Sequence, residues 1–316
     1  MKILITGVHG FVGGNLVADL SKEHTVSGLD IISPKKEGVE ATYSWEDLDA
    51  GRVPEVDAIV HLAGKAHDTK NQADAEVYFK VNRDLTIKMF DYFLAHEGIK
   101  KFVFFSTAKA VADKVDGVLT EEVVPVPVGP YGESKIAAER YILDAMESRK
   151  DEFMEKLVYI FRPCMIHGPG NKGNLNLLYN VVRKGIPWPL GAFENRRTFT
   201  SVENICFAVN GVLTKDVPSG IYNMGDDEAL STNELIEDIC KSLGKKTHIW
   251  RLPKGLMTGV AKLGGILHLP LNPERLQKLT ENYVSSNAKI KKALDTDKMP
   301  VDARTGLQRT LESFKD

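Results

Sequence analysis

The chain opens with a short apolar run that passes directly into a turn containing three glycines: Met1-Lys2-Ile3-Leu4-Ile5-Thr6-Gly7-Val8-His9-Gly10-Phe11-Val12-Gly13. Residues 2–6 have the length and composition of one buried strand. Glycines at this spacing allow a tight turn, a close approach of the backbone to a pyrophosphate, and close packing of the following helix on the strand. We expect that helix over residues 11–22, with its positive N-terminal end directed at the phosphates.

A second strand, expected over residues 25–29, ends at Asp30. An acidic residue about twenty positions after such a turn is where the ribose 2′-hydroxyl of a dinucleotide is held. Asp30 would repel a 2′-phosphate, and Ile31 and Ile32 supply no arginine to attract one. The pattern therefore favours NAD over NADP, which stays the alternative cofactor. A simple capping role for Asp30 in the loop is the other interpretation.

Length and composition indicate a globular protein of one or two domains, with 316 residues, 43% hydrophobic, and a net charge of −2. Because there is no basic excess, we expect no nucleic-acid partner. Cys164, Cys206 and Cys240 form no CxxC pair, which argues against a metal site and a disulfide framework. A strand that begins at residue 2 leaves no room for a signal peptide. A reducing, cytoplasmic location is the simplest expectation.

The rest of the first half alternates continuous apolar runs with helical patterns. We expect strands over residues 58–62, 101–105 and 157–161, and helices over residues 73–96 and 134–146. This alternation predicts an α/β fold with a Rossmann-type doubly wound parallel sheet, whose ligand lies beyond the carboxyl ends of the strands. From Pro163 onward Gly, Pro and Asn cluster, which predicts a smaller C-terminal α/β portion that binds the substrate.

The expected division places the NAD-binding domain at residues 1–165, with a returning segment near 198–225. Residues 166–197 and 226–316 would form the substrate domain. One apolar stretch, residues 256–271, is interrupted by Lys262 and His268 and is too short to span a membrane. We expect a substrate-domain helix there, with contact to a membrane surface as the alternative.

Tyr131 and Lys135 form the catalytic pattern of the chain, because residues four apart share one face of a helix. An ammonium near the phenol would lower the pKa of Tyr131, so that it exchanges a proton near neutral pH. Upstream, the strand at residues 102–105 ends at Ser106 and Thr107, and a hydroxyl there could reach the same substrate oxygen. Together with the glycine turn and the acidic strand end, these parts occur in an order that chance rarely produces.

At these residues the chain resembles the extended short-chain dehydrogenase/reductase (SDR) family, and within it the nucleotide-sugar epimerases, dehydratases and reductases. Residues 6–13 are similar to its TGxxGFxG motif, and residues 60–64 to its HLAA strand end, with Gly64 replacing alanine. Residues 162–170 are similar to its RPxxxYGPG segment, with His167 where tyrosine is usual.

The resemblance implies a role for each matched residue. Thr107 would bind the reacting oxygen, Tyr131 would be the acid/base, and Lys135 would hold the nicotinamide ribose. Implied cofactor contacts are Gly7, Gly10, Phe11, Val12, Gly13, Asp30, Asp47, Leu48, Leu62, Ala63, Gly64, Asn82, Tyr131, Lys135 and Pro163. Implied substrate contacts are Lys109, His167, Asn174, Arg197 and Arg275.

The resemblance also implies hydride transfer at a sugar carbinol carbon, normally C4, with NAD as cofactor. The 4,6-dehydratases carry Asp-Glu after the active-site Ser/Thr, whereas this chain has Ala108-Lys109, so dehydration by that route is not expected. We expect reduction of a UDP-4-keto-6-deoxy-N-acetylhexosamine in bacterial surface-polysaccharide biosynthesis. A UDP-hexose or UDP-N-acetylhexosamine 4-epimerase is the alternative, and a non-catalytic NAD-binding module is the third.

Family members often dimerise through a four-helix bundle, so the resemblance implies a homodimer in which residues 74–95 and 134–146 supply the helices. Burial of those helices on their own sheet is the alternative.

Overall fold

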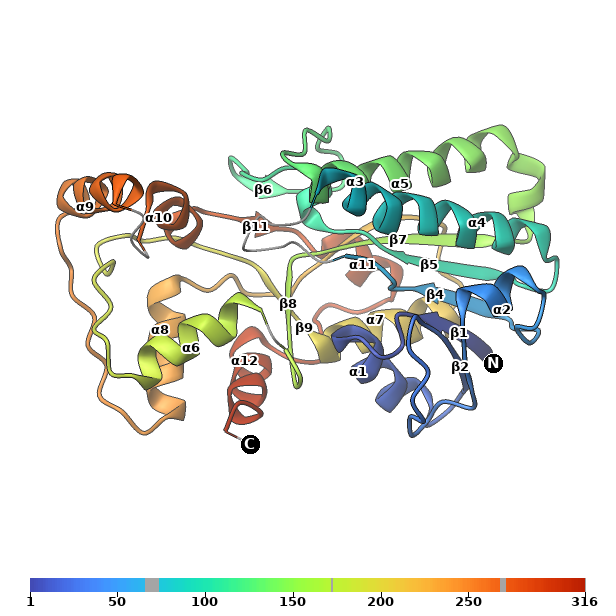
Figure 1. Ribbon diagram of the computed structural model, residues 1–316, viewed down its shortest axis with the longest axis horizontal. Coiled ribbons are helices and arrows are strands. Elements are labelled where there is room, and N and C mark those ends of the chain that lie inside the picture. Colours follow the sequence, from blue (N-terminus) through green and yellow to red (C-terminus); the bar gives the residue numbers. More distant parts are fainter. Residues whose placement is uncertain (66–73, 172, 268–270, 316) are drawn as a thin grey trace.

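The computed structural model describes residues 1–65, 74–171, 173–267 and 271–315, and a parallel seven-stranded sheet forms its centre (Figure 1). The strands lie in the order β10-β7-β5-β4-β1-β2-β3. Their bounds are β1 Lys2–Thr6, β2 Thr25–Leu29, β3 Thr42–Tyr43, β4 Ala58–His61, β5 Lys101–Phe105, β7 Leu157–Pro163 and β10 Gly220–Met224. The chain runs outward from β1 in one direction and from β4 in the other. The switch point of this Rossmann-type sheet, where ligands bind, therefore lies between β1 and β4.

One face of the sheet is covered by the helices that precede β5 and β7 (Figure 1). These are α3 Ala75–Tyr78, the π-helix η1 Phe79–Asp84, α4 Leu85–Ala95 and α5 Pro130–Ser148. Phe90 and Phe93 of α4 and Ile142 of α5 pack with Phe102 of β5 in one buried cluster. The short helix α2, Trp45–Asp49, adds Leu48 to the same cluster.

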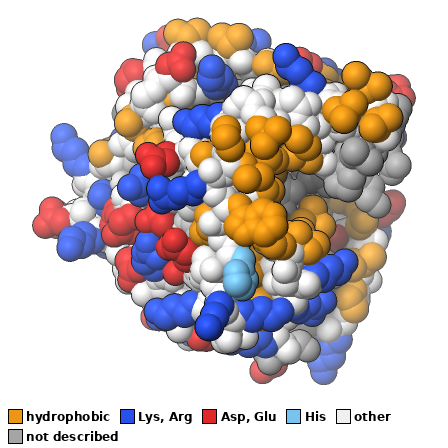
Figure 2. Space-filling view, turned by 90° about the vertical axis from the view of Figure 1, so that its left-hand side faces the viewer, with side chains coloured by type: hydrophobic (Ala, Val, Ile, Leu, Met, Phe, Trp, Pro, Cys, Tyr) orange, Lys and Arg blue, Asp and Glu red, His pale blue; other side chains and the backbone are white. Residues whose placement is uncertain are grey.

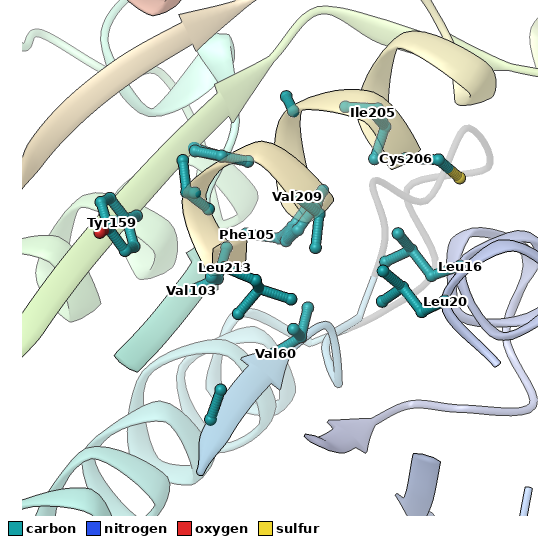
Figure 3. Packing of buried hydrophobic residues seen from close by; sticks show 14 of the residues in the cluster. Leu16, Leu20, Val60, Val103, Phe105, Tyr159, Ile205, Cys206, Val209 and Leu213 are labelled. Atoms are coloured by element: carbon teal, nitrogen blue, oxygen red, sulfur yellow. The ribbon is translucent and has the colours of Figure 1, made fainter. Parts of the chain in front are cut away.

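The opposite face is covered by α1, Phe11–Leu20, and α7, Val202–Thr214 (Figure 3). Figure 3 shows Leu16 and Leu20 of α1 facing Val209 and Leu213 of α7 above Val60 of β4. Strands buried on both faces explain the continuous apolar runs of the sequence. The core therefore consists of two hydrophobic layers with the sheet between them.

A second group of helices packs around its own hydrophobic cluster beside the carboxyl ends of the strands. These helices are α6 Asn174–Arg183, α8 Thr232–Ser242, α9 Lys254–Ile266, α10 Pro273–Thr280 and α12 Ala303–Glu312. Two small parallel pairs connect the two parts: β6 Val118–Leu119 with β11 Val284–Ser285, and β8 Met165–His167 with β9 Phe199–Ser201. The remaining elements are the 3-10 helices η2 Ala108–Ala110 and η3 Lys150–Met154, and α11 Ala288–Ala293.

Most expected elements of the first half are confirmed, with changed ends. The first helix ends at Leu20 rather than at residue 22, β4 ends at His61, and β7 continues to Pro163. The helix expected over 134–146 begins at Pro130, after Gly129 at a φ of 83°. The helix expected over 73–96 is divided into α3, η1 and α4. Residue 73 and residues 268–270 of the apolar stretch lie outside the described residues.

Within the described ranges, no helix is both long and apolar enough to cross a membrane. The same ranges contain no cluster of His, Cys, Asp or Glu arranged to hold a metal ion. Cys164, Cys206 and Cys240 are free and buried. Burial raises the pKa of Cys164 and of Cys206 to about 12, so both thiols are protonated at neutral pH.

Candidate active site

The glycine turn after β1 brings three pieces of backbone together. A Cβ at Gly13 would lie 2.3 Å from the Gly7 carbonyl oxygen, and Gly7 itself adopts a φ of 70° with its Cβ position 3.0 Å from the Ala63 nitrogen. Gly10 precedes the first residue of α1, Phe11, and offers no side-chain cap to the helix N-terminus. The turn and the open N-terminus form a backbone cradle that fits the pyrophosphate of NAD.

Asp30 stands at the end of β2, beside this turn. Its Oδ2 accepts the His9 amide at 3.0 Å, and its Oδ1 accepts the Ile31 amide at 2.7 Å. The half-buried carboxylate therefore caps the turn, and each oxygen keeps a second lone pair for a ribose hydroxyl. The two roles considered for Asp30 are compatible.

A buried chain of hydrogen bonds fixes the end of β4 against β1. Thr6 Oγ1 accepts the amides of Leu62 at 3.1 Å and Ala63 at 2.9 Å, and lies 2.7 Å from Nδ1 of His61. His61 Nε2 lies 3.0 Å from Oγ1 of Thr86. Burial, together with the charge of the nearby Lys135, lowers the pKa of His61 to about 3. His61 is therefore a neutral link in the chain.

Asn82 braces the segment that follows β4. Its Oδ1 accepts the Lys65 amide at 2.7 Å, and its Nδ2 donates to Oγ of Ser134 at 3.0 Å. A Cβ at Gly64 would lie 3.0 Å from Asn82 Oδ1 and 3.2 Å from Lys135 Nζ. The glycine that replaces the usual alanine thus occupies a crowded position. Asn82 is fully buried, so it acts on the site through the segment that it braces.

Thr107, Tyr131 and Lys135 converge at the carboxyl end of β5. The Tyr131 phenol and the Thr107 hydroxyl share a hydrogen bond, and Lys135 Nζ donates to the Phe105 carbonyl at 2.8 Å. Close packing explains this meeting, because a Cβ at Gly132 would lie 2.5 Å from the Lys109 carbonyl oxygen. Only a glycine lets α5 approach η2 so closely.

The electrostatics of Tyr131 differ from the expectation. Burial raises the pKa of the phenol, the Thr107 hydrogen bond opposes that rise, and the neighbouring Tyr78 adds to it. Burial also lowers the pKa of Lys135 to about 8, against the opposing charge of Glu139. The pKa of Tyr131 is therefore raised and not lowered as expected: burial is the largest cause, and Lys135 is not among the groups that shift it.

Two features of the site escaped the sequence analysis. The Tyr78 ring packs edge-on against the Tyr131 ring, with centroids 6.3 Å apart. Behind Lys135, the buried Glu139 carboxylate accepts Nε of Arg162 at 3.1 Å and the hydroxyl of Ser106. Glu139 follows Tyr131 by eight residues on α5, so helical spacing could have revealed it. Tyr78 has no such signal.

Three residues that were predicted to contact cofactor or substrate bind other parts of the chain: Asp47, Leu48 and Lys109. Asp47 forms a capping box with Ser44 and an ion pair with Arg52, and Leu48 is buried in the sheet cluster. The adenine contacts expected of Asp47 and Leu48 stay predictions. Lys109 is paired with Asp113, four residues along the chain.

His167 is placed differently from the expectation of a substrate contact. It is 1% exposed, its Nδ1 lies 2.9 Å from Oγ1 of Thr310, and its Nε2 lies 3.4 Å from Oδ2 of Asp226. The imidazole therefore joins β8 to α12 in the interior. The substrate contact expected of His167 stays a prediction.

The other predicted substrate residues lie in the second helical group. Arg197 is largely buried, and its Nη1 donates to the Lys278 carbonyl of α10 at 2.6 Å. Burial lowers the pKa of Arg197, and the nearby Glu281 opposes this effect. Arg275 is exposed one turn earlier on α10, and Asn174 is exposed at the start of α6.

Residues 3–225 match the NAD dependent epimerase/dehydratase family. The chain belongs to this family. It is an NAD-dependent enzyme of the extended SDR type, in the branch of nucleotide-sugar epimerases and reductases. The backbone cradle and the strand-end trio lie where a doubly wound sheet binds its ligand.

Named relatives of this NAD-dependent epimerase/dehydratase include both epimerases and a reductase. A UDP-glucose 4-epimerase of Vibrio cholerae is 31% identical over 80% of this chain and 78% of its own length. An N-acetyl-α-D-glucosaminyl-diphospho-ditrans,octacis-undecaprenol 4-epimerase of Escherichia coli O157:H7 is 26% identical over 98% of this chain and 94% of its own length. A GDP-6-deoxy-D-mannose reductase of Pseudomonas aeruginosa is 25% identical over 75% of this chain and 78% of its own length.

Solved structures share the fold. The UDP-glucuronic acid 4-epimerase of Bacillus cereus in complex with NAD has a TM-score of 0.75 at 20% identity, covering 100% of this chain and 99% of its own. MoeE5 in complex with UDP-glucose and NAD has a TM-score of 0.77 at 22% identity, covering 100% of this chain and 99% of its own. At these identities the likeness establishes the Rossmann-type architecture.

Proposed function

We propose that the protein reduces the C4 ketone of a UDP-4-keto-6-deoxy-N-acetylhexosamine in bacterial surface-polysaccharide biosynthesis. The observation that carries this proposal is the shared hydrogen bond of Thr107 and Tyr131 at the carboxyl end of β5, with Lys135 beside it. NADH supplies the hydride that reaches C4. Three free thiols support a reducing, cytoplasmic setting.

In this proposal each side chain has a separate task. Tyr131 donates its proton to the substrate O4 as C4 accepts the hydride, so the ketone becomes a carbinol. Thr107 hydrogen-bonds the same oxygen and aligns it with the phenol. Lys135 binds the nicotinamide ribose, and its positive charge, once the cofactor orders the site, favours the phenolate that remains.

The residues after Thr107 support reduction over dehydration. Ala108 is buried and Lys109 is paired with Asp113, so neither position supplies the carboxylate that removal of water from C5 and C6 would use. The sugar can therefore be reduced at C4 without loss of water.

We assign the diphosphate to Arg197. Its guanidinium donates one hydrogen bond to the Lys278 carbonyl and keeps further donors, and arginine matches phosphate oxygens with a planar fork of donors. Asn174 and Arg275 are proposed as further contacts. The substrate domain would then comprise residues 166–197 and 226–316, and the NAD-binding domain residues 1–165 with the segment near 198–225.

A 4-epimerase is the second candidate, because a UDP-glucose 4-epimerase is 31% identical to this chain. Epimerisation would use the same trio twice, first to oxidise C4 and then to reduce the turned keto sugar. The relative named as an N-acetyl-α-D-glucosaminyl-diphospho-undecaprenol 4-epimerase supports a lipid-linked sugar as a further candidate substrate.

The deciding experiment supplies purified protein with UDP-4-keto-6-deoxy-N-acetylglucosamine and NADH and follows absorbance of the reduced cofactor. One NADH consumed for each product carbinol, identified by NMR, supports the reductase. Parallel incubations contain UDP-glucose, UDP-galactose, UDP-N-acetylglucosamine or UDP-N-acetylgalactosamine without added cofactor. Interconversion in those tubes, without consumption of NADH in the first, would establish the epimerase instead.

We also infer a homodimer that buries the outer surfaces of α4 and α5. The two helices are held side by side, with the Tyr141 hydroxyl donating to Asp91 at 2.6 Å, and Val77 of the adjoining α3 is exposed. Light scattering on the purified protein should give twice the chain mass. A monomeric mass would reject this interface.

A further inference from the structure

Helix α9 leaves a row of apolar side chains in contact with water. At 100° per residue, positions 256, 260, 263 and 267 fall on one side of a helix, next to the side formed by positions 257, 261 and 264. The side formed by positions 257, 261 and 264 is buried against α10 and the hydrophobic cluster of the helical group. The first side is exposed: Leu256, Val260, Leu263 and Leu267 are between 44% and 57% accessible. We call these four residues the α9 stripe.

The stretch that contains the stripe is strongly basic. Between residues 239 and 273 the sequence has no Asp or Glu, in a chain whose net charge is −2. All its Lys and Arg side chains within the described residues are exposed: Lys241, Lys245, Lys246, Arg251, Lys254 and Lys262. Positive charge on this scale, with apolar side chains beside it, complements an anionic apolar surface.

The position of α9 in the molecule makes the stripe accessible. Figure 1 shows the chain leaving α8, running along the outer edge, and entering α9 at the extremity farthest from β1 and β2. Figure 2, which views that side, shows hydrophobic side chains gathered in a band, with Lys and Arg below it and a mixture of Lys, Arg, Asp and Glu on its left. Single domains rarely leave such a patch exposed without a use for it.

A second copy of the chain is a poor match for this surface. Two α9 stripes in contact would bring two acid-free basic stretches together, and like charges in an apolar interface are costly. A bilayer surface that contains anionic phospholipid accepts leucine and valine side chains and attracts the surrounding lysines at the same time.

We propose that α9, with the basic stretch before it, docks in the plane of a membrane surface that contains anionic phospholipid. The stripe enters the boundary between headgroups and acyl chains, and Lys262 of the same helix binds lipid phosphates. The enzyme would then work at the membrane surface, with its active site on the aqueous side. This docking adds to the proposed reaction and does not depend on it.

The test is flotation of the full-length protein with vesicles. One set contains phosphatidylcholine alone, and the other contains phosphatidylcholine with one third phosphatidylglycerol. We expect binding to the second set, with about fivefold weaker partitioning for Lys262→Gln. Leu263→Ser should weaken partitioning about tenfold because a leucine no longer enters the apolar layer.

A matched control is Leu177→Ser on α6, whose side chain is 60% exposed and lies outside the stripe. It should bind as the unchanged protein does. Reduction of soluble substrate should be equal in all these variants, so loss of binding reports on the surface and not on folding. The proposal is overturned if the unchanged protein does not float with anionic vesicles, or if Leu263→Ser and Leu177→Ser behave alike. A dimer mass that Leu263→Ser abolishes, without vesicle binding, would instead assign the stripe to a second copy.

Discussion

The sheet region and the helical group beyond it both pair buried polar side chains, but they differ in the groups that they leave exposed. Around the sheet, buried polar side chains bind one another, as Asn82 does with Ser134 and Glu139 does with Arg162. In the helical group, Arg197 donates to a carbonyl, and α9 exposes apolar side chains to water. The sheet region holds a fixed geometry for its cofactor, whereas the helical group carries the residues that we propose for the substrate diphosphate and for the membrane surface.

We expect the largest effect on turnover from a substitution at Tyr131. Tyr131→Phe removes the proton donor, and we expect turnover to fall by about a thousandfold while the protein keeps its fold and its affinity for NAD. Tyr141→Phe on the same helix removes a hydroxyl that donates to Asp91, and serves as the control. Steady-state kinetics and thermal unfolding test both. Turnover of Tyr131→Phe within tenfold of the parent would remove Tyr131 from the acid/base role.

A substitution at Glu139 tests the buried polar contacts around the sheet. Glu139→Gln leaves the buried Arg162 charge without its partner, so we expect the free energy of unfolding to fall by about 3 kcal/mol. Glu147→Gln, also on α5, removes an exposed partner of Lys150 and should have little effect. Urea denaturation at neutral pH measures the difference. Equal stability of the two variants would show that the buried pair does not hold this region together.

The glycine turn offers a comparison between adjacent residues. Gly13→Ala would place a Cβ 2.3 Å from a backbone oxygen, so we expect strain of about 2 kcal/mol and at least tenfold weaker NAD binding. At Gly14 the added Cβ would meet only Lys36 Nζ, at 3.4 Å, and Gly14→Ala should bind NAD normally. Calorimetric titration with NAD distinguishes the two, and similar affinities would contradict the cradle.

The pKa of Lys135, lowered by burial to about 8, predicts the pH dependence of reduction. Below pH 8 the side chain carries its positive charge, and above it the charge is lost. We therefore expect kcat/KM to decline above about pH 8, by tenfold for each further pH unit. His61, with a pKa of about 3, stays neutral throughout and adds no limb between pH 5 and 9. A profile that stays flat well above pH 8 would show that the Lys135 charge is not needed.

The smallest expected effect concerns the choice of cofactor. Asp30→Ala removes the carboxylate that repels a 2′-phosphate, so preference for NAD over NADP should narrow by about tenfold, on the order of 1 kcal/mol. Asp19→Ala on α1, where the carboxylate pairs with exposed Lys22, controls for loss of charge. Kinetics with both cofactors give the ratio, and an unchanged ratio would mean that Asp30 acts only as a cap.

The contrast between the two regions also explains what the sequence could reveal. Buried strands and tight glycine positions need particular residue types at particular spacings. The sequence alone therefore predicts β1, β2, β5 and the turn at Gly7. The meeting of Thr107 with Tyr131 follows from the strand end and the helix that passes it. Their protonation does not, because the pKa depends on burial that only the folded chain creates.

The less predictable residues depend on distant partners. His167 occupies the position of a family tyrosine, but Thr310, more than a hundred residues later, holds it in the interior. Thr310 is not visible in any local motif, whereas the capping box of Ser44 with Asp47 is local and could have been predicted from the sequence. The contacts that the resemblance implies for His167 and Asp47 stay predictions.

The π-helix η1 limits how this chain can change in length. A π turn contains one residue more than the α turn that it replaces, and here it joins α3 to α4. Deleting one residue within Phe79–Asp84 would restore a regular helix and rotate α3 by about 100°. Tyr78 would then leave the ring of Tyr131 although neither residue had been altered. Insertions and deletions near this turn therefore affect the catalytic phenol more than many substitutions closer to it.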